Sequence, residues 1–337
     1  MPKLKVAMIA KKLPELALMQ KQLEGIDYDF DVYICESDGE TMEAVKGVDL
    51  IINQGVKMPK SVIDEIDSAK AIVSFAHGFD HIDHEAATNN SVMVVNTAGF
   101  CTEEVSNHAI MLILACAKKL ITLDKMTRLG SWGAETNAVM NNMVPVTDQT
   151  LGLIGLGNIG RAVARKAQAL GLSVIAYDPF VAPWLAREYR VQLSSDMYEI
   201  AGQSDFISMH IPLNNQTRKM VGKRFFDSMK SSAYFINTCR GGTVDETELI
   251  ASLKASKFAG AGIDVFETEP TSRDNPLFKM DNVIVTPHTA GTSNRAKIAA
   301  QVQVGQEAAR LLNGTWPMSL VNPEVRSQID SRSPATI

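Results

Sequence analysis

The segment from Leu151 to Asp178 constrains the fold of this chain more than any other. An apolar run enters the glycine-rich sequence Gly-Leu-Gly-Asn-Ile-Gly, a helical pattern follows over 161–171, and a second apolar run ends on an acid. A strand, a tight turn, a helix and a second parallel strand are typical of one half of a dinucleotide-binding fold. The sequence therefore predicts a parallel α/β sheet with a phosphate-binding turn after its first strand.

Each glycine of this turn has its own physical role. Gly155 allows the tight turn, Gly157 lets backbone amides approach a pyrophosphate, and Gly160 lets the helix lie close to the strand. The amino end of the helix then presents unpaired N–H groups and a favourable dipole to the phosphates. Asp178 follows Gly160 by 18 residues, where its carboxylate would accept hydrogen bonds from the adenosine ribose and repel a 2′-phosphate. A turn that only packs would leave this acid unexplained, so we expect NAD, rather than NADP, as the cofactor.

Composition excludes several classes of protein. The chain has 337 residues, 45% of them hydrophobic, which suits a globular protein of two domains. A net charge of −5 without a basic block argues against nucleic acid as a partner. The first apolar run ends at Lys11 and is too short for a signal peptide, and the segment 109–117 is too short to span a membrane. We therefore expect a cytoplasmic protein without a membrane partner.

The cysteines have neither close pairing nor the spacing of metal ligands. They are Cys35, Cys101, Cys116 and Cys239, and their neighbours are apolar or mixed. Such an arrangement is typical of reduced thiols in the cytosol. The sequence therefore predicts free thiols and no metal site.

Short apolar runs alternate with helical patterns along the chain, which is typical of a parallel α/β architecture. The strands are expected in two groups. Those before residue 100 are 5–10, 29–35, 50–53, 71–75 and 93–96. Those that follow the glycine-turn unit are 206–210, 234–237, 260–265 and 283–286.

The fold class is therefore expected to be α/β, with two Rossmann-like or flavodoxin-like parallel-sheet domains. A helix after Thr102 is apolar on every face of its middle part, so it must be buried all round. A later helix over 294–312 lies beyond the nucleotide block and would cross back to complete the first domain. We predict an NAD-binding domain at 101–291, inserted into a discontinuous substrate domain at 1–100 and 292–325, with a frayed tail at 326–337.

Arg240, Glu269 and His288 each follow a late strand of the second group. Ligands of open parallel sheets bind beyond the carboxyl ends of the strands, so all three are expected near the reactive end of a dinucleotide. Hydride transfer to a 2-oxo acid leaves an alkoxide that needs a proton, and a histidine can supply it or remove it in the reverse reaction. A carboxylate would orient the imidazole, and a guanidinium would bind the substrate carboxylate. Singly, these residues could be a surface ion pair, a solvated acid and a turn cap, but their joint placement favours catalysis.

Together these motifs resemble the D-isomer-specific 2-hydroxyacid dehydrogenase family over nearly the whole chain. The resemblance lies in 78–83, 102–108, 155–160, 237–242, 244–246, 264–270 and 287–291. It implies a small 2-oxo or 2-hydroxy acid as substrate, with His288 as acid/base, Glu269 as its partner and Arg240 orienting the substrate. It also implies NAD contacts by residues on several loops. These are Gly155, Gly157, Asn158, Ile159, Gly160, Asp178, His210, Thr238, Cys239, Arg240, Asp264, His288 and Gly291.

The resemblance further implies that backbone amides of Ala76, His77 and Gly78 hold the substrate carboxylate. His77 stands where the family more often has a small or aliphatic residue, so it either contacts a second anionic group of the substrate or lies on the surface. Family members are commonly dimers joined through their nucleotide domains, so a homodimer is expected. Trp132 and the methionine-rich stretch 140–143 would line the substrate pocket or, as we slightly favour, pack in the dimer.

Two other functions remain open from the sequence. An NAD(H)-sensing protein like the C-terminal-binding corepressors, which share this fold, would retain the same residues with little turnover. A phosphite-type dehydrogenase would also retain Arg240, Glu269 and His288. Three further histidines, His81, His84 and His108, show no partner pattern and are expected to be structural or solvated.

Overall fold

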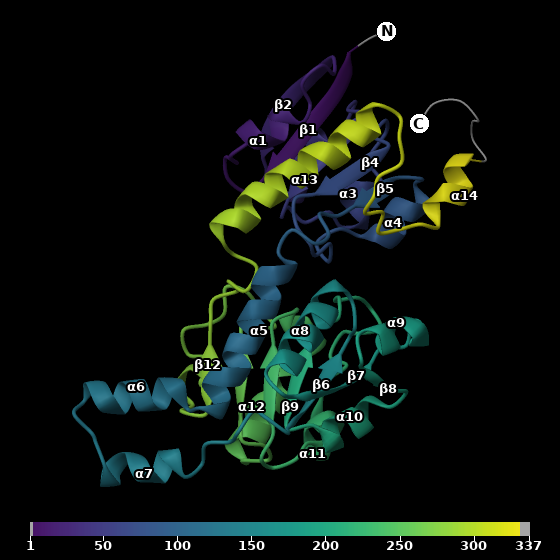
Figure 1. Ribbon diagram of the computed structural model, residues 1–337. Helices are drawn as coiled ribbons and strands as arrows, with labels where there is room; N and C mark the ends of the chain where they lie inside the picture. Colours follow the sequence, from purple (N-terminus) through teal and green to yellow (C-terminus); the bar gives the residue numbers. More distant parts are fainter. Residues whose placement is uncertain (1–2, 331–337) are drawn as a thin grey trace. The chain divides into compact units, whose positions relative to one another are not determined.

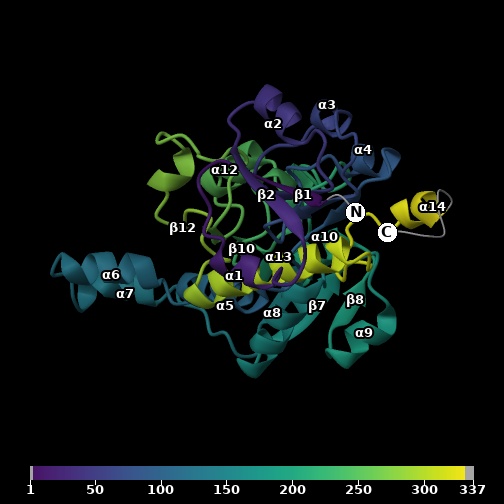
Figure 2. The same cartoon turned by 90° about the horizontal axis from the view of Figure 1, so that it is seen from above.

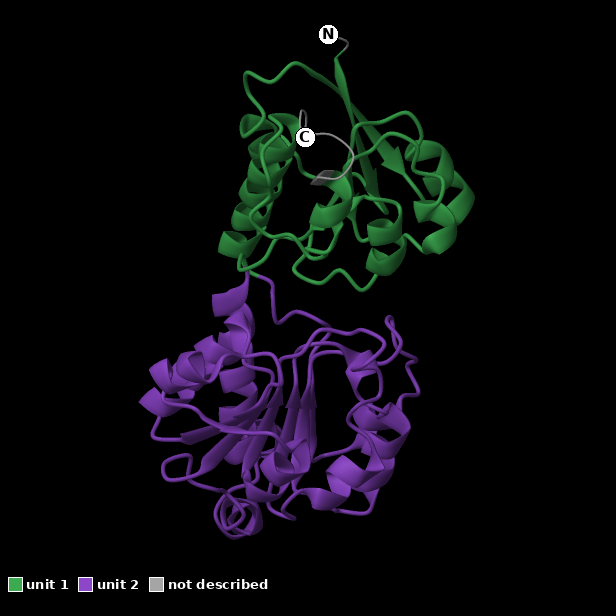
Figure 3. Ribbon diagram, turned by 90° about the vertical axis from the view of Figure 1, so that its right-hand side faces the viewer, with its two compact units in different colours: residues 1–100, 293–337 green, residues 101–292 purple. Residues whose placement is uncertain are grey.

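The computed structural model describes residues 3–330 and divides the chain into two compact units (Figure 3). Unit 1 consists of residues 1–100 and 293–337, and unit 2 consists of residues 101–292. Each unit contains a parallel sheet between layers of helices, so the expected α/β class is confirmed. Within the described part of the chain, no helix combines the length and the apolar character needed to cross a membrane.

Unit 1 contains a five-stranded sheet in the order β2-β1-β3-β4-β5. Its strands are β1 (Leu4–Ala10), β2 (Tyr28–Ile34), β3 (Leu50–Gln54), β4 (Ala71–Ser74) and β5 (Met93–Val95). Side chains of a strand alternate between the two faces, so Met8 and Ile9 enter opposite cores and both are fully buried. The strand order reverses between β1 and β3, and ligands of such sheets bind beyond the carboxyl ends of the strands near this point.

Helices cover both faces of this sheet (Figure 1). One face carries α2 (Asp38–Ala44), α3 (Lys60–Ile63) and α4 (His84–Asn89), and the other carries α1 (Ala17–Lys21) and α13 (Asn294–Leu312). Helix α13 packs closely on α1 because residue 305 is glycine. A Cβ atom on Gly305 would lie 2.5 Å from the carbonyl oxygen of Met19.

The segment after α13 returns to the edge of the sheet and forms a helix that the sequence did not predict. Leu320 forms an antiparallel bridge to Val95, and α14 (Val325–Asp330) follows. The expectation of a frayed tail at 326–337 was therefore wrong over its described part. Val325 is fully buried in the core of unit 1, and Leu320 and Ile329 pack against the same core. Residues 331–337 lie outside the described residues.

Unit 2 contains a seven-stranded sheet in the order β12-β11-β10-β9-β6-β7-β8. Its strands are β6 (Thr150–Ile154), β7 (Ser173–Tyr177), β8 (Gln192–Ser194), β9 (Phe206–Met209), β10 (Tyr234–Asn237), β11 (Gly260–Ile263) and β12 (Val283–Val285). The order reverses between β6 and β9, which places the glycine turn at the point where nucleotides bind in sheets of this kind. The edge strand β8 was not predicted, because it has three residues and none is buried.

The helices of unit 2 form a layer on each face of its sheet. One layer contains α5 (Thr102–Ala117), α8 (Asn158–Ala169) and α9 (Pro183–Glu188). The other contains α10 (Met197–Gln203), α11 (Lys223–Ser228) and α12 (Glu246–Lys254). Short 3-10 helices are η1 (Gly241–Thr243) and η2 (Pro276–Lys279). Within a single chain α5 is not covered on every face, since Met111 is 46% exposed, so the expected burial all round stays a prediction that needs a further surface such as a second subunit.

Two helices of unit 2 extend away from its sheet as an arm (Figures 1 and 2). They are α6 (Leu120–Arg128) and α7 (Ala134–Met140), and α6 has no buried residue. The arm exposes large apolar side chains, among them Leu129 (77%) and Trp132 (79%). Exposed apolar side chains concentrated in this way are typical of an interaction surface.

Candidate active site

The glycine turn between β6 and α8 is shaped by two close approaches and one open position. Gly155 has a φ of +99°, and a Cβ atom there would lie 2.4 Å from the carbonyl oxygen of His210. A Cβ atom on Gly160 would lie 2.3 Å from the carbonyl oxygen of Gly155. At Gly157, the N-cap of α8, a Cβ atom would meet no atom within 4 Å. The chain itself therefore requires the first and third glycines, whereas the second keeps the helix N-terminus open to a phosphate.

Asp178 follows β7 and has a structural role that the sequence did not reveal. Its Oδ2 atom accepts a hydrogen bond from the Leu156 amide (2.8 Å). Its Oδ1 atom accepts from the amides of Phe180 (2.9 Å) and Val181 (3.2 Å). The carboxylate thus joins the glycine turn to the loop after β7, and its expected contact with the adenosine ribose stays a prediction. Asn158 in the turn accepts a hydrogen bond from the Arg161 guanidinium (2.6 Å).

His210 and Thr238 follow the neighbouring strands β9 and β10. The His210 amide donates to the carbonyl of Ile154 (2.8 Å), and its Nε2 atom lies 2.9 Å from the Ser208 hydroxyl. Burial lowers the pKa of His210 to about 3, so the imidazole is neutral at physiological pH. The hydroxyl of Thr238 is buried and has no hydrogen-bond partner among residues 3–330. A buried polar atom normally has a partner, so this hydroxyl fits a site that a cofactor completes.

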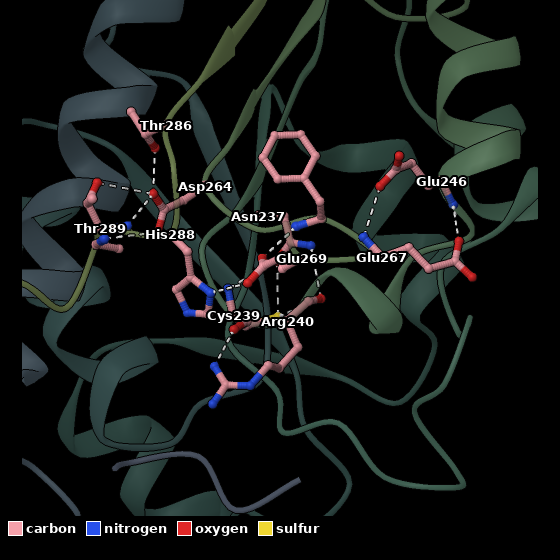
Figure 4. A network of polar contacts seen from close by, with 12 residues as sticks. Asn237, Cys239, Arg240, Glu246, Asp264, Glu267, Glu269, Thr286, His288 and Thr289 are labelled. Atoms are coloured by element: carbon pink, nitrogen blue, oxygen red, sulfur yellow. Dashed lines mark hydrogen bonds and ion pairs between the residues drawn. The ribbon is translucent and has the colours of Figure 1, made fainter. Parts of the chain in front are cut away.

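Arg240 is presented by a turn that Asn237 closes. The Asn237 side chain accepts from the Cys239 amide (3.1 Å) and donates to the carbonyl of Arg240 (3.2 Å). The guanidinium donates to the carbonyl of Cys239 (2.7 Å), as Figure 4 shows. A Cβ atom on Gly241 would lie 1.9 Å from the carbonyl carbon of Phe266. Glycine therefore allows this turn to lie against the loop that follows β11.

Glu269 and His288 form a close pair beyond β11 and β12 (Figure 4). The distance from His288 Nδ1 to Glu269 Oε2 is 2.6 Å, and Glu269 Oε1 accepts from the Phe266 amide (2.9 Å). Burial by itself would raise the pKa of Glu269, but the hydrogen bonds from His288 and Phe266 and the positive charges of His288 and Arg240 outweigh it. The net effect lowers the pKa of Glu269, so this carboxylate is ionised beside the imidazole.

Asp264 fixes the backbone that carries His288. His288 has a φ of +53°, a left-handed conformation that is uncommon for residues other than glycine. Its amide donates to the carbonyl of Asp264 (2.8 Å). The fully buried Asp264 carboxylate accepts from the amides of Thr289 (2.9 Å) and Ala290 (2.9 Å). These bonds hold a conformation that costs free energy, as is common for residues of active sites.

In unit 2 the structure brings Arg240, Glu269 and His288 to the carboxyl ends of neighbouring strands. Cys239 lies in the same turn as Arg240, and burial raises the pKa of its thiol. Gly291 lies beside the start of α5, where a Cβ atom would be 3.5 Å from the Cys101 side chain. Ile159 lies in the first turn of α8.

Among the residues that the structure describes, no group of three or more His, Cys, Asp or Glu side chains is placed to hold a metal ion.

The loop over 76–78 in unit 1 has its carbonyl groups fixed by hydrogen bonds. The Ala76 carbonyl accepts from the Thr97 amide (3.1 Å), and the His77 carbonyl accepts from the Asn96 side chain (2.7 Å). The amides of Ala76 and Gly78 donate to no acceptor within 3–330. Neighbouring N–H groups with fixed carbonyls form a surface that suits an anion.

His108 is a residue whose role the sequence analysis missed. Its Nε2 atom lies 3.0 Å from the Thr286 hydroxyl, which in turn lies 2.5 Å from an oxygen of Asp264. His108 was expected to be structural or solvated, and its contact with Thr286 makes it structural, as part of the network behind His288. Because 178 residues separate it from Thr286, no local pattern could indicate this contact.

Comparisons with known proteins agree with the geometry. Residues 110–290 match the family model described as D-isomer specific 2-hydroxyacid dehydrogenase, NAD binding domain. A glyoxylate reductase of Korarchaeum cryptofilum is 32% identical over 323 residues, which cover 94% of this chain and 96% of that protein. A D-3-phosphoglycerate dehydrogenase of Methanocaldococcus jannaschii is 35% identical over 284 residues, or 84% of this chain. The match covers 53% of that protein, so the chain spans about half the length of this curated relative.

A solved structure with the same fold is that of an acyclic imino acid reductase in complex with NADPH and D-arginine. It has a TM-score of 0.83 and 27% sequence identity, and the match covers 94% of this chain and 100% of that one. The family model, the sequence relatives and this fold point to one assignment, and they confirm the resemblance seen in the motifs. The chain belongs to the D-isomer-specific 2-hydroxyacid dehydrogenase family.

Proposed function

We propose that the chain is an NAD-dependent oxidoreductase that interconverts a D-2-hydroxy acid and the corresponding 2-oxo acid. The observation that carries the proposal is the 2.6 Å pair of His288 and Glu269 at the carboxyl end of a dinucleotide-binding sheet. The nicotinamide, when bound, accepts or supplies the hydride. The chain's own residues then have to bind the substrate and move one proton.

His288 is the acid/base in this proposal. Its Nδ1 atom is directed to the ionised Glu269, which leaves Nε2 as the atom that exchanges a proton with the substrate oxygen. In reduction, Nε2 donates a proton as negative charge develops on the carbonyl oxygen. In oxidation, Nε2 accepts the hydroxyl proton. Glu269 holds the ring in the required orientation and stabilises its protonated form.

Donors for anionic groups are proposed in each unit by itself. In unit 2, Arg240 offers a planar guanidinium that can form two parallel hydrogen bonds to the substrate carboxylate. The Asn237 side chain holds the turn that carries Arg240. In unit 1, the amides of Ala76 and Gly78 are neutral donors that suit an anion. His77 lies between them in the sequence, and its Nδ1 atom accepts a weak hydrogen bond from the Gly99 amide (3.5 Å).

NAD is the proposed cofactor, in preference to NADP. The open backbone at Gly157 and the unpartnered Thr238 hydroxyl fit a bound dinucleotide. Asp178 places a negative charge at the end of β7, and the residues after it are Pro179 and Phe180, which carry no cation. A 2′-phosphate would therefore meet the repulsion of Asp178, and the nearby Arg161 guanidinium is already engaged by the Leu156 carbonyl and the Asn158 side chain.

We also propose a homodimer formed through unit 2. The exposed apolar residues of the arm and a cavity of about 730 Å³ beside α5, α6 and α7 leave a surface that a second copy can cover. Sedimentation velocity of Leu129→Glu tests this proposal, with Leu13→Glu as a control that is equally exposed in unit 1. We expect a monomer for the first variant only. The thiols of Cys35, Cys116 and Cys239 form no disulfide, which supports the proposal of a reducing compartment such as the cytoplasm.

The activity is tested by NADH consumption, followed by absorbance, with a panel of 2-oxo acids. The panel runs from glyoxylate and hydroxypyruvate through pyruvate and phenylpyruvate to oxaloacetate and 2-oxoglutarate. We expect turnover with at least one member. Tight NADH binding without turnover on any of them would contradict the proposal, and would leave an NAD(H) sensor or a phosphite-type dehydrogenase to be tested with phosphite.

A further inference from the structure

A chain of hydrogen bonds runs from helix α5 to the segment that carries His288. His108 on α5 lies 3.0 Å from Thr286, which follows β12, and Thr286 lies 2.5 Å from Asp264, which follows β11. Figure 4 shows the Thr286 and Thr289 contacts of Asp264 beside the imidazole of His288. All of these residues belong to unit 2.

The direction of each hydrogen bond in this chain follows from the partners. The Thr286 hydroxyl donates its proton to the Asp264 oxygen, which accepts several hydrogen bonds here. The Thr286 oxygen is then left to accept from Nε2 of His108. Burial lowers the pKa of His108, and the charge of Asp264 offsets this only in part, so the ring is neutral and has one N–H. That N–H must be on Nε2.

We infer that His108 is a positioning residue for the acid/base His288. By donating to Thr286, it turns the Thr286 hydroxyl toward Asp264 and so fixes the carboxylate. That carboxylate holds the amides of Thr289 and Ala290, and the carbonyl of the same residue holds the amide of His288. His108 thereby acts on the left-handed backbone of His288 without contacting substrate.

The same carboxylate is one of the groups that the family resemblance assigns to the cofactor. Loss of the Nε2 donor frees the Thr286 hydroxyl to rotate and to donate elsewhere. Asp264 then loses one of its donors and part of its fixed orientation. Both the cofactor and the acid/base would be held less well, and small displacements of reacting groups lower rates strongly.

A double-mutant cycle tests this inference, which rests on the proposed function. His108→Leu removes the donor, and Thr286→Val removes the hydroxyl with little change in shape. We expect each variant to lower kcat by about tenfold and the double variant to lower it by no more, because both remove one connection. His108→Gln, whose amide nitrogen can reach the same position, should retain kcat within about threefold.

Two results would overturn the inference. One is a fall in kcat of about a hundredfold in the double variant. Two tenfold effects that multiply would mean that His108 and Thr286 act independently. The other is an equal fall in kcat for His108→Gln and His108→Leu. Such a result would mean that the packing of residue 108 matters and that its hydrogen bond to Thr286 does not. Asn107→Leu, at the exposed neighbouring position of α5, is the control and should leave kcat unchanged.

A second readout separates this inference from the proposed function. The dissociation constant of NADH, measured by fluorescence, needs no turnover. If the unmodified protein reduces no 2-oxo acid, the proposed function fails, and the cycle is evaluated on NADH binding alone. Weaker binding in both single variants with no further loss in the double variant supports the positioning role, and unchanged or multiplied effects contradict it.

Discussion

The two parallel sheets of this chain end in loops with different chemistry. In unit 2, charged side chains follow β11 and β12 and are held as partners, as in the pair of Glu269 and His288. In unit 1, the loop after β4 offers backbone amides, and its carbonyl groups are fixed by Thr97 and Asn96. Ionisable side chains can exchange protons, whereas backbone dipoles attract an anion at every pH. Under the proposed function, one architecture would therefore serve proton transfer in unit 2 and pH-independent anion binding in unit 1.

The largest expected effect concerns the proton-transfer side of this comparison. His288→Ala should lower kcat by about a hundredfold to ten-thousandfold, the usual range for loss of a general acid/base. The NADH dissociation constant should change by less than about twofold, because the imidazole acts on substrate. Steady-state kinetics and fluorescence titration measure the two quantities. An unchanged kcat would show that His288 is not the acid/base. The proposed difference between unit 2, which transfers a proton, and unit 1, which binds an anion, would then lose its support.

The next effect concerns cofactor choice. Asp178→Ala should shift the ratio of kcat/KM for NADH over NADPH by about tenfold toward NADPH, because a ribose acceptor and a repulsive charge are both lost. The carboxylate also joins the glycine turn to the loop after β7, so Asp178→Asn serves as a control. Asparagine removes the charge and keeps one acceptor oxygen. If neither variant moves the ratio, Asp178 does not contact the ribose.

A smaller effect is expected in unit 1. Asn96→Ala removes the hydrogen bond that fixes the His77 carbonyl, so the loop over 76–78, which we propose binds an anion, should lose part of its order. We expect KM for the 2-oxo acid to rise by about threefold to tenfold with kcat nearly unchanged, which is the signature of lost uniform binding. A fall in kcat with KM unchanged would show that this loop takes part in the chemical step.

The smallest effect concerns the pH dependence of stability. Burial lowers the pKa of His210 to about 3 from the ordinary histidine value of about 6.5, so between these limits the unfolded chain binds a proton that the folded chain does not. Stability should therefore fall as pH decreases from 6.5 toward 3. His210→Gln removes this proton, and we expect its Tm to fall less than the wild-type Tm between pH 7 and pH 5, by a few degrees. Equal falls would mean that His210 titrates alike in both states.

The sequence predicted those features that local patterns encode. Apolar runs of four or more residues gave most strands, and the glycine spacing located the turn before α8. The positions of Arg240, Glu269 and His288 could be predicted because parallel strands bring their carboxyl ends to one edge. The pairing of Glu269 with His288 was proposed from their chemistry, and the structure places them 2.6 Å apart.

What could not be predicted depends on contacts between distant residues. Thr286, the partner of His108, lies 178 positions away in the sequence. The hydrogen bond from the Leu156 amide to Asp178 forms only when the glycine turn is folded. The short strand β8 is exposed and carries a weak apolar signal. Helix α14 depends on the burial of Val325 in a core that distant segments build.

The return of the chain from unit 2 to unit 1 has a consequence for synthesis on the ribosome. The first hundred residues emerge early, but the face of their sheet that contains Met8 and Ile52 is covered by α13, which is made after all of unit 2. Unit 2 is continuous and can fold as soon as it has emerged. Unit 1 must keep an apolar sheet face uncovered while almost two hundred residues are translated. The inserted order of the units thus leaves one apolar face of the unit 1 sheet without its covering helix until α13 has been made.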